Sequence, residues 1–198
     1  MRVFIAVIIL IFSLQSWTKA DDIRDFEIEG MSIGDSALDY LTVKEINENL
    51  FKNYFKNGKK RKYYVTGYFN SNKYDQIEIY IKTGDKKYTI KAITGFKDIK
   101  NLKTCITRRN EITDEIKNLF KNIEPIFYDD IPHSFDKSGK SKQYQAGFLL
   151  KNDPQKDQIR IECTIWSNKM KTKNQFMDTL GISVFSTETL MWVENGYQ

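Results

Sequence analysis

Proline, glycine, cysteine and histidine are all scarce in this chain of 198 residues. It contains 3 Pro, 10 Gly, 2 Cys and 1 His. So little proline and glycine excludes collagen-like and low-complexity sequences, and a hydrophobic content of 40% with 29% charged residues excludes a wholly disordered chain. The length suits one domain, or at most two small ones.

Long apolar runs are also missing, except at the N-terminus. There Arg2 precedes an apolar run over residues 3–12, and a polar stretch ends at Ala20. This pattern predicts a secretory signal peptide, residues 1–20, cleaved after Ala20. The alternative is a membrane anchor, but a spanning helix needs about 20 apolar residues. No Cys lies near the cleavage position, which argues against a lipoprotein, and no later run is long enough to span a bilayer.

The charge balance excludes a strongly basic protein. The whole chain carries 31 basic and 26 acidic residues; removing residues 1–20 takes away Arg2 and Lys19 and no acid, which leaves a net charge of +3. A nucleic-acid-binding domain would be distinctly more basic, so we expect no nucleic-acid partner. No Asn-x-Ser/Thr sequon occurs, which favours a bacterial periplasm over a eukaryotic secretory route. The expected location is the periplasm or outside the cell.

The expected location determines how the two cysteines are interpreted. In an oxidising compartment, Cys105 and Cys163 without a third Cys predict one disulfide. Closing a loop of 58 positions would stabilise the fold by about 4 kcal/mol. We expect this bond to join a helix to a strand. The alternative is a Cys nucleophile, but His133 is the only His and nothing in the sequence connects it to either Cys.

The periodicity predicts an α+β domain over residues 21–198, an antiparallel sheet with helices packed on it. Apolar–polar alternation indicates strands, and 3–4 spacing indicates helices. Thr42 and Glu45 form a capping-box pattern that opens a helix ending at Asn57-Gly58. Residues 124–141 have no regular pattern. The other predicted elements are a three-stranded meander over 62–96, a helix over 98–121, strands over 144–150, 159–165 and 181–185, and a final helix capped by Ser186 or Thr187.

Two segments of the predicted strands have similar sequences. Residues 64–79 and residues 144–161 each read Tyr-x-x-Gly-aromatic and later Asp-Gln-Ile-x-Ile, with two more residues between the motifs in the second copy. Each copy leads into a further strand and a helix, so the chain could consist of two β-β-β-α units. A chance likeness between aromatic-rich strand pairs is the other explanation.

One local cluster could support catalysis. Asp129, Asp130 and His133 would offer two carboxylates and an imidazole, enough for acid–base chemistry or for part of a metal site. A solvated loop explains the same residues, since adjacent carboxylates rarely point the same way. The run Gly139-Lys140-Ser141 matches part of a phosphate-binding loop, but Ser134 stands where the motif requires Gly. We therefore expect no cofactor.

A second cluster could bind a partner. The densest positive run is interleaved with aromatic residues, and this combination suits an anionic partner or sugar faces. A solvated helix end, with lysines that discourage edge-to-edge sheet pairing, is the alternative. The binding candidates are Lys56, Lys59, Lys60, Arg61 and Tyr63.

The sequence also resembles known proteins. Residues 29–36, Glu-Gly-Met-Ser-Ile-Gly-Asp-Ser, follow the signal peptide, and residues 136–141 lie between the first Cys and a later Cys-Thr-Ile-Trp-Ser. This arrangement resembles a group of small uncharacterised secreted proteins of marine bacteria with streamlined, AT-rich genomes, and the likeness includes both cysteines. The stretch 30–36 resembles the start of BamE-like envelope-assembly modules, where a helix pair precedes a small sheet.

These observations favour an exported envelope or binding protein without catalytic activity, acting on an envelope protein or a small ligand. A small hydrolase or metal-dependent enzyme using Asp129, Asp130 and His133 is the alternative.

Overall fold

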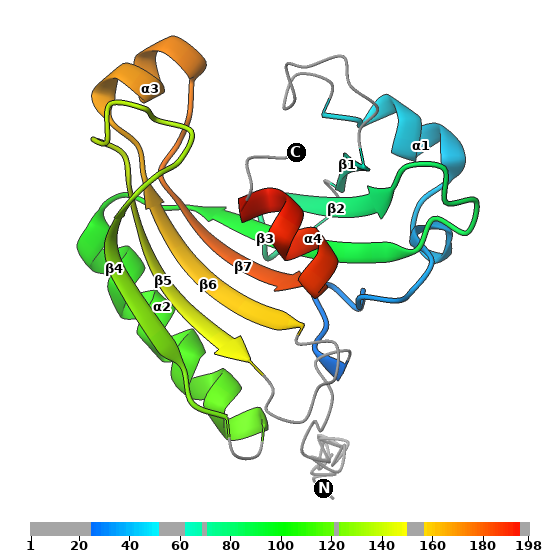
Figure 1. Cartoon of the computed structure of the whole chain (residues 1–198), viewed down its shortest axis with the longest axis horizontal. Coiled ribbons are helices and arrows are strands. Elements are labelled where there is room, and N and C mark those ends of the chain that lie inside the picture. The colour runs from blue at the N-terminus through cyan, green and yellow to red at the C-terminus, as the bar shows by residue number, and fades with distance from the viewer. Residues whose placement is uncertain (1–24, 52–61, 69–70, 121–122, 150–156, 195–198) are drawn as a thin grey trace, which may run out of the picture.

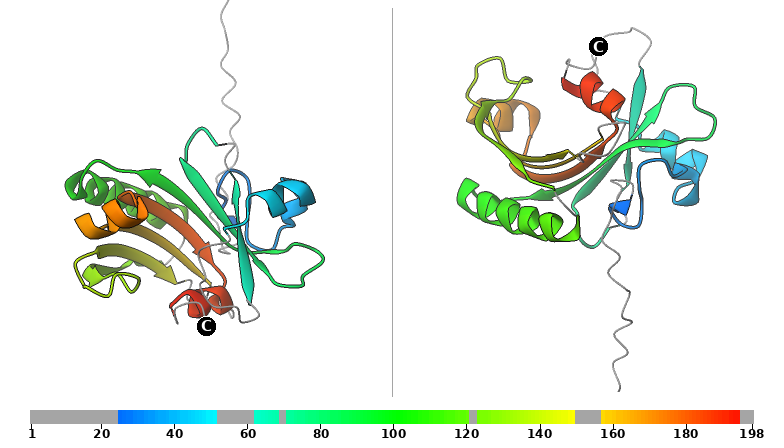
Figure 2. Two further views of the ribbon diagram at one scale, coloured as in Figure 1. Left: turned by 90° about the horizontal axis from the view of Figure 1, so that it is seen from above. Right: turned by 60° about the horizontal axis from the view of Figure 1, so that its bottom comes forward.

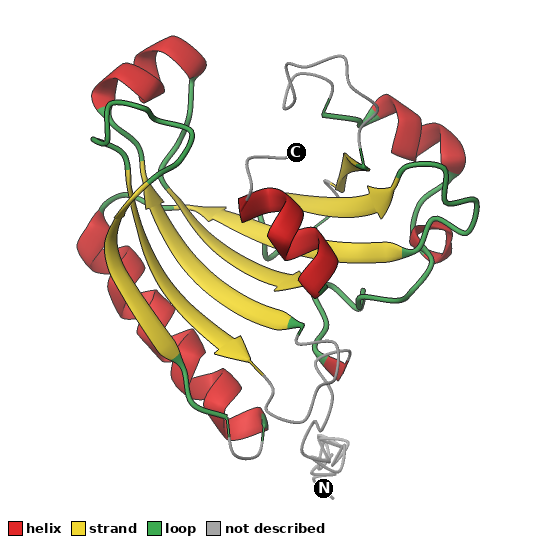
Figure 3. Cartoon of the chain, in the orientation of Figure 1, coloured by secondary structure: helices red, strands yellow, loops and turns green. Residues whose placement is uncertain are grey.

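All strands of the described chain belong to one antiparallel sheet. The structure is a computed structural model, which describes residues 25–51, 62–68, 71–120, 123–149 and 157–194. The predicted signal peptide lies outside these residues. In the described part, no helix is long and apolar enough to cross a membrane. The strand order is β1-β2-β3-β7-β6-β5-β4, and all pairs are antiparallel. The α+β architecture is as predicted (Figure 3).

The chain forms its helices and strands in the following order from the N-terminus. They are η2 (Ala37–Asp39), α1 (Val43–Glu48), β1 (Tyr63–Tyr68), β2 (Gln76–Lys82), β3 (Ile90–Asp98), α2 (Leu102–Leu119), β4 (Ile126–Pro132), β5 (Lys142–Leu149), β6 (Gln158–Ile165), α3 (Asn168–Asn174), β7 (Thr179–Phe185) and α4 (Thr187–Glu194).

We distinguish the two faces of the sheet by the helix that lies on each. The outer face carries α2, which packs on β5, β6 and β7, and the inner face carries α4 (Figures 1 and 2). Figure 2 shows strands β4 to β7 curving, with α2 on the convex side and α4 on the concave side. Because side chains alternate along a strand, the register assigns each residue to one face.

The disulfide fixes α2 to the outer face. Cys105 on α2 is bonded to Cys163 on β6, with 5.9 Å between their Cα atoms. This helix-to-strand bond confirms the prediction. The buried side of α2 includes Ile112 and Ile116, which pack with the outer side chains of β5 and β6 in the main core. Asn101 caps the helix by accepting a hydrogen bond from the Thr104 amide at 2.9 Å.

The N-terminal segment covers the outer face of the other half of the sheet. Ile28, Met31 and Ile46 are buried in the main core, which also contains Ile77, Ile79 and other outer residues of β2 and β3. The Thr42–Glu45 capping box that opens α1 is present as predicted.

The two similar segments, residues 64–79 and 144–161, occupy equivalent places in the sheet. In each copy the motif glycine pairs with the third residue of the next strand, Gly67 with Glu78 and Gly147 with Arg160. The third strands β3 and β7 then pair with each other, with Thr94 opposite Ser183. A pseudo-twofold axis perpendicular to the sheet passes between these two residues, whose hydroxyl groups are hydrogen-bonded at 2.9 Å.

Equivalent contacts extend this relation beyond the strands. Asp75 accepts a hydrogen bond from the Asp98 amide at 2.8 Å, and Asp157 accepts one from the Thr187 amide at 3.0 Å. These four residues occupy equivalent positions in the two copies. The Leu50–Thr66 bridge likewise matches the pairing of Phe127 with Ala146.

Both predicted β-β-β-α segments are present in chain order, β1 to β3 followed by α2 and β5 to β7 followed by α4, with α3 inserted before β7. The two following helices cover opposite faces of the sheet, so the unit that repeats in space begins with a helix instead. The first unit is α1, the short segment 49–51 and β1 to β3; the second is α2 followed by β4 to β7. In both units the helix lies on the outer face, α1 against β1 and α2 against β5 to β7. Helix α4 has no counterpart and lies on the inner face, where Trp192 packs with Tyr63, Val65, Tyr80, Ala92 and Phe185.

Three local predictions differ from the structure. The helix opened by Thr42 ends at its C-cap, Asn49, because Phe51 donates its amide to the Val65 carbonyl of β1 at 3.0 Å instead of continuing the helix. Residues 126–132, expected to be irregular, form the edge strand β4. Helix α3 was not predicted.

Candidate functional site

The two candidate carboxylates lie on a bulge in the edge strand β4. The register with β5 shifts between Tyr128 and Ile131, so Asp129 and Asp130 together oppose Tyr144, and Asp130 has a φ of 57°. An extra residue in one strand of an antiparallel pair produces this bulge, and Asp tolerates the left-handed backbone better than most residues. Both side chains contact residues of the outer face.

Each of these carboxylates has cationic or hydroxyl partners. Asp129 pairs with Arg109 of α2 at 2.6 Å. The Arg109 side chain is 5% exposed, and its guanidinium lies 5.1 Å from the centre of the Phe127 ring. Asp130 lies 3.4 Å from the Lys142 ammonium and 3.4 Å from the Tyr144 hydroxyl. The Asp129–Arg109 pair therefore joins the edge strand to α2.

His133 lies on the opposite side of the sheet. Its ring is 4.3 Å from that of Trp166, which follows β6 on the inner face, and its Nδ1 accepts the Phe135 amide hydrogen at 3.1 Å. Burial lowers the pKa of His133, against the opposing effect of the Glu162 and Asp136 charges. The structure therefore does not bring Asp129, Asp130 and His133 together. Among the described residues, no three His, Cys, Asp or Glu side chains are grouped to hold a metal ion.

The predicted basic cluster is only partly described. Lys56, Lys59, Lys60 and Arg61 lie outside the described residues. Tyr63 lies on β1 and is fully buried, its ring 5.0 Å from that of Trp192. Burial raises the pKa of Tyr63 to about 12. Since α4 covers this ring, Tyr63 offers no surface for a ligand.

The loop between β4 and β5 is organised around Asp136. This buried carboxylate accepts hydrogen bonds from the amides and hydroxyls of Ser138 and Ser141, and from the Ser167 hydroxyl at 2.9 Å. These hydrogen bonds, the one from the Ser141 hydroxyl foremost, hold the pKa of Asp136 well below its ordinary value. The serine of the partial phosphate-loop sequence, Ser141, therefore helps to hold Asp136 in place. The hydrogen bond from Ser167, the N-cap of α3, connects this loop to the start of that helix.

The inner face of the second unit is the candidate site. Glu162 of β6 is its centre: Gln143 donates to Oε1 at 2.7 Å, Gln145 donates to Oε2 at 2.6 Å, and the Thr164 hydroxyl donates to Oε1 at 2.8 Å. Of these four residues, only Thr164 is buried; the other three are half-buried. The network holds its side chains in fixed positions while leaving them accessible.

A second polar group extends this surface toward α4. The Arg160 guanidinium donates to Gln158 at 3.0 Å and to Glu194 of α4 at 2.6 Å. At the β4 edge the surface is apolar, with Ile126, Tyr128 and Leu149 between 42% and 52% exposed. Exposed apolar side chains bordered by polar groups are typical of a surface that binds a partner.

The sequence held one signal for this surface. Gln143, Gln145, Arg160 and Glu162 alternate with apolar residues along β5 and β6, as expected for strands buried on one side. Alternation alone does not distinguish a solvated face from a network, because that requires the register of β5 against β6. That register places Gln145 opposite Glu162.

No protein-family model matches the sequence, and the comparisons with curated proteins and with solved structures found no match. The chain's own geometry is therefore the basis for its proposed function.

Proposed function

We propose that this chain is an exported, non-catalytic binding protein of the bacterial envelope, which holds a partner on the inner face of its second unit. The Glu162 network is the observation that carries this proposal. Its hydrogen-bonding groups are already oriented, so a partner would order few side chains on binding.

The shape of the surface favours a macromolecular partner. The network lies on an open sheet face, with an apolar edge formed by Ile126, Tyr128 and Leu149. Small ligands are generally held in concave pockets that bury most of their surface, whereas a partner protein can cover a wide sheet face. An envelope protein is therefore the favoured partner, ahead of a small ligand.

Export is part of the proposal. It is supported by the N-terminal sequence of residues 1–20 and by the Cys105–Cys163 disulfide, a bond that persists in oxidising compartments.

The enzymatic alternative has less support. It needs Asp129, Asp130 and His133 to act on one substrate, but the carboxylates contact residues of the outer face and His133 contacts Trp166 on the inner face. We expect Asp130→Ala to leave the protein's cellular function intact. Loss of function in Asp130→Ala with the fold unchanged would favour the enzyme.

In-cell photo-crosslinking tests the binding surface. A photoreactive residue at Gln145 should give a defined adduct with an envelope protein, and Glu162→Lys in the same chain should abolish it. The control places the photoreactive residue at Glu115, an exposed position on α2. Identical adducts from both positions, or none from Gln145, would contradict the proposal.

The charge reversal also needs a control. Glu115→Lys changes the net charge as Glu162→Lys does, but on the outer side of the molecule. We expect Glu115→Lys to leave the Gln145 adduct unchanged. Circular dichroism should show that both variants fold.

A further inference from the structure

Two segments far apart in the sequence form one end of the molecule. The β4–β5 loop, residues 133–141, and residues 166–178, which include α3, lie together beyond the ends of the second-unit strands (Figures 1 and 2). The Asp136–Ser167 hydrogen bond joins them, and so does the contact between the Phe135 and Phe176 rings at 5.9 Å. We call these residues the α3 end.

Aromatic rings connect the α3 end to its surface. Four rings follow one another from the inner face outward: His133 contacts Trp166, Trp166 contacts Phe176 at 4.5 Å, and Phe176 contacts Phe135. The outermost ring, Phe135, is 52% exposed, and Met177 is 59% exposed. Large apolar side chains left in solvent on a rigid support indicate an interaction surface.

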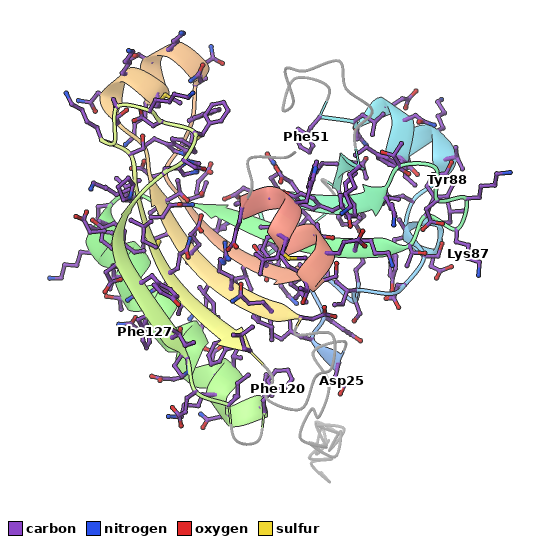
Figure 4. The ribbon with its side chains drawn as sticks, in the orientation of Figure 1. Asp25, Phe51, Lys87, Tyr88, Phe120 and Phe127 are labelled. Carbon is purple, nitrogen blue, oxygen red and sulfur yellow. A yellow bond between two sulfur atoms is a disulfide. The ribbon has the colours of Figure 1, made fainter. Side chains whose placement is uncertain are left out.

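The same segments carry an excess of positive charge. They contain five lysines and two aspartates. Asp136 is buried within its own hydrogen bonds, and Asp178 pairs with Lys171 at 2.7 Å. Of the five lysines, Lys171 alone forms an ion pair with a described residue. The other four, Lys137, Lys140, Lys169 and Lys173, are exposed. Figure 4 shows nitrogen-tipped side chains extending outward around α3.

We propose that the α3 end binds the surface of an anionic lipid bilayer. Phe135 and Met177 would enter the headgroup region, and the four lysines would lie against the lipid phosphates. Aromatic side chains are favoured at that depth, and each lysine near an anionic surface strengthens binding about fivefold. A soluble polyanion would use the lysines but would give Phe135 and Met177 nothing apolar to enter.

This proposal is independent of the partner on the inner face. It uses different residues and a different class of partner, so either can fail without the other. Together they would describe a protein that holds an envelope partner beside the membrane.

Vesicle sedimentation tests the proposal with the exported protein recovered from cells, its N-terminus determined. We expect binding to vesicles of phosphatidylcholine with about 30% phosphatidylglycerol to exceed binding to pure phosphatidylcholine at least tenfold, and to weaken with salt. Phe135→Ser with Met177→Ser should lower it about tenfold. Replacing the four lysines by Gln should lower it by more, since each contributes about fivefold.

Matched variants control for charge and hydrophobicity elsewhere. Leu38→Ser with Met191→Ser removes two exposed apolar side chains from η2 and α4, and Gln at Lys86, Lys87, Lys100 and Lys103 removes four exposed lysines. We expect both to bind like the unmodified chain. Thermal melting should be similar for all variants.

Three results would overturn the proposal. One is equal binding to both kinds of vesicle. Another is an equal loss of binding in the control variants. The third is binding that survives the Phe135 and Met177 changes while the lysine changes abolish binding to vesicles and to heparin alike, which would identify a general polyanion site.

Discussion

The two units of the sheet have the same strand register but differ in what covers their inner faces. Over the first unit, α4 buries Tyr63, Val65 and Tyr80 beneath Trp192. The second unit keeps its inner side chains partly accessible, and there they are Gln143, Gln145 and Glu162.

Residues at equivalent positions in the two units differ in exposure in the same way. Glu78 and Arg160 are each the third residue of the second strand in their unit, and each is hydrogen-bonded to the glutamine two residues earlier, Gln76 or Gln158. Glu78 is 1% exposed, while the Arg160 side chain is 13% exposed and reaches α4. One copy of the repeat therefore contributes to the interior, and the other contributes to the surface.

Removing the disulfide should have the largest effect and should act on the second unit. We expect Cys105→Ala with Cys163→Ala to lower the free energy of unfolding by about 4 kcal/mol, because the bond closes a loop of 58 positions. Urea unfolding measures this loss, and reduction of the unmodified protein is the control. Amide exchange should accelerate more in β5 and β6 than in β1 and β2; equal acceleration would show that the units unfold together.

Removing the Trp192 ring, which covers the inner face of the first unit, should lower the free energy of unfolding slightly less. Trp192→Ala should lower the free energy of unfolding by about 3 to 4 kcal/mol, since the ring is 3% exposed among five buried side chains. Met191→Ala, on the exposed side of the same helix, should change it by under about 0.5 kcal/mol. If urea unfolding gave equal losses for the two variants, Trp192 would not be the residue that packs α4 on the sheet.

A glycine present only in the first unit offers a third test. An added Cβ at Gly95 would lie 2.5 Å from the Tyr74 ring, whereas the equivalent position in the second unit is Val184. We expect Gly95→Ala to destabilise by about 1 to 3 kcal/mol, because the ring must move. Gly147→Ala should cost less, since its nearest neighbour is the end of the flexible Gln158 side chain at 3.3 Å. Thermal melting distinguishes the two.

Acid should weaken the α3 end, which has no counterpart in the first unit. Hydrogen bonds lower the pKa of folded Asp136, so its stabilising contribution is complete above the unfolded value of about 3.9 and declines as pH falls toward the folded value. We expect the stability difference between the unmodified chain and Asp136→Asn to narrow below pH 4. A constant difference in acid melting curves would show that the carboxylate charge is unimportant.

The equivalent aspartates compare the two units at matching positions. Asp157 is 2% exposed, so Asp157→Ala, which leaves the Thr187 amide without its carboxylate partner, should cost about 2 kcal/mol. Asp75→Ala should cost under about 1 kcal/mol, since the Asp75 side chain is 40% exposed. If urea unfolding gave equal losses, burial would not distinguish the two copies.

The sequence predicted the elements whose local pattern and tertiary role agree. The meander, α2, the final helix and the disulfide have clear periodicity or composition, and all are present. It failed where tertiary contacts override local preference: Leu50 and Phe51 fit a helix but pair with β1, and the exposed strand β4 lacks alternation because it lies at an edge with a bulge. The Glu162 network requires the β5–β6 register, which no local pattern provides.

The disulfide also determines how the chain is connected. Strands β4 and β5 and their loop lie between Cys105 and Cys163 in the sequence, so they belong to a covalent ring closed through sulfur. A protease that cuts once within residues 133–141 would open this ring without releasing a fragment. Such a nicked protein would keep its mass on a non-reducing gel and separate into two pieces only after reduction.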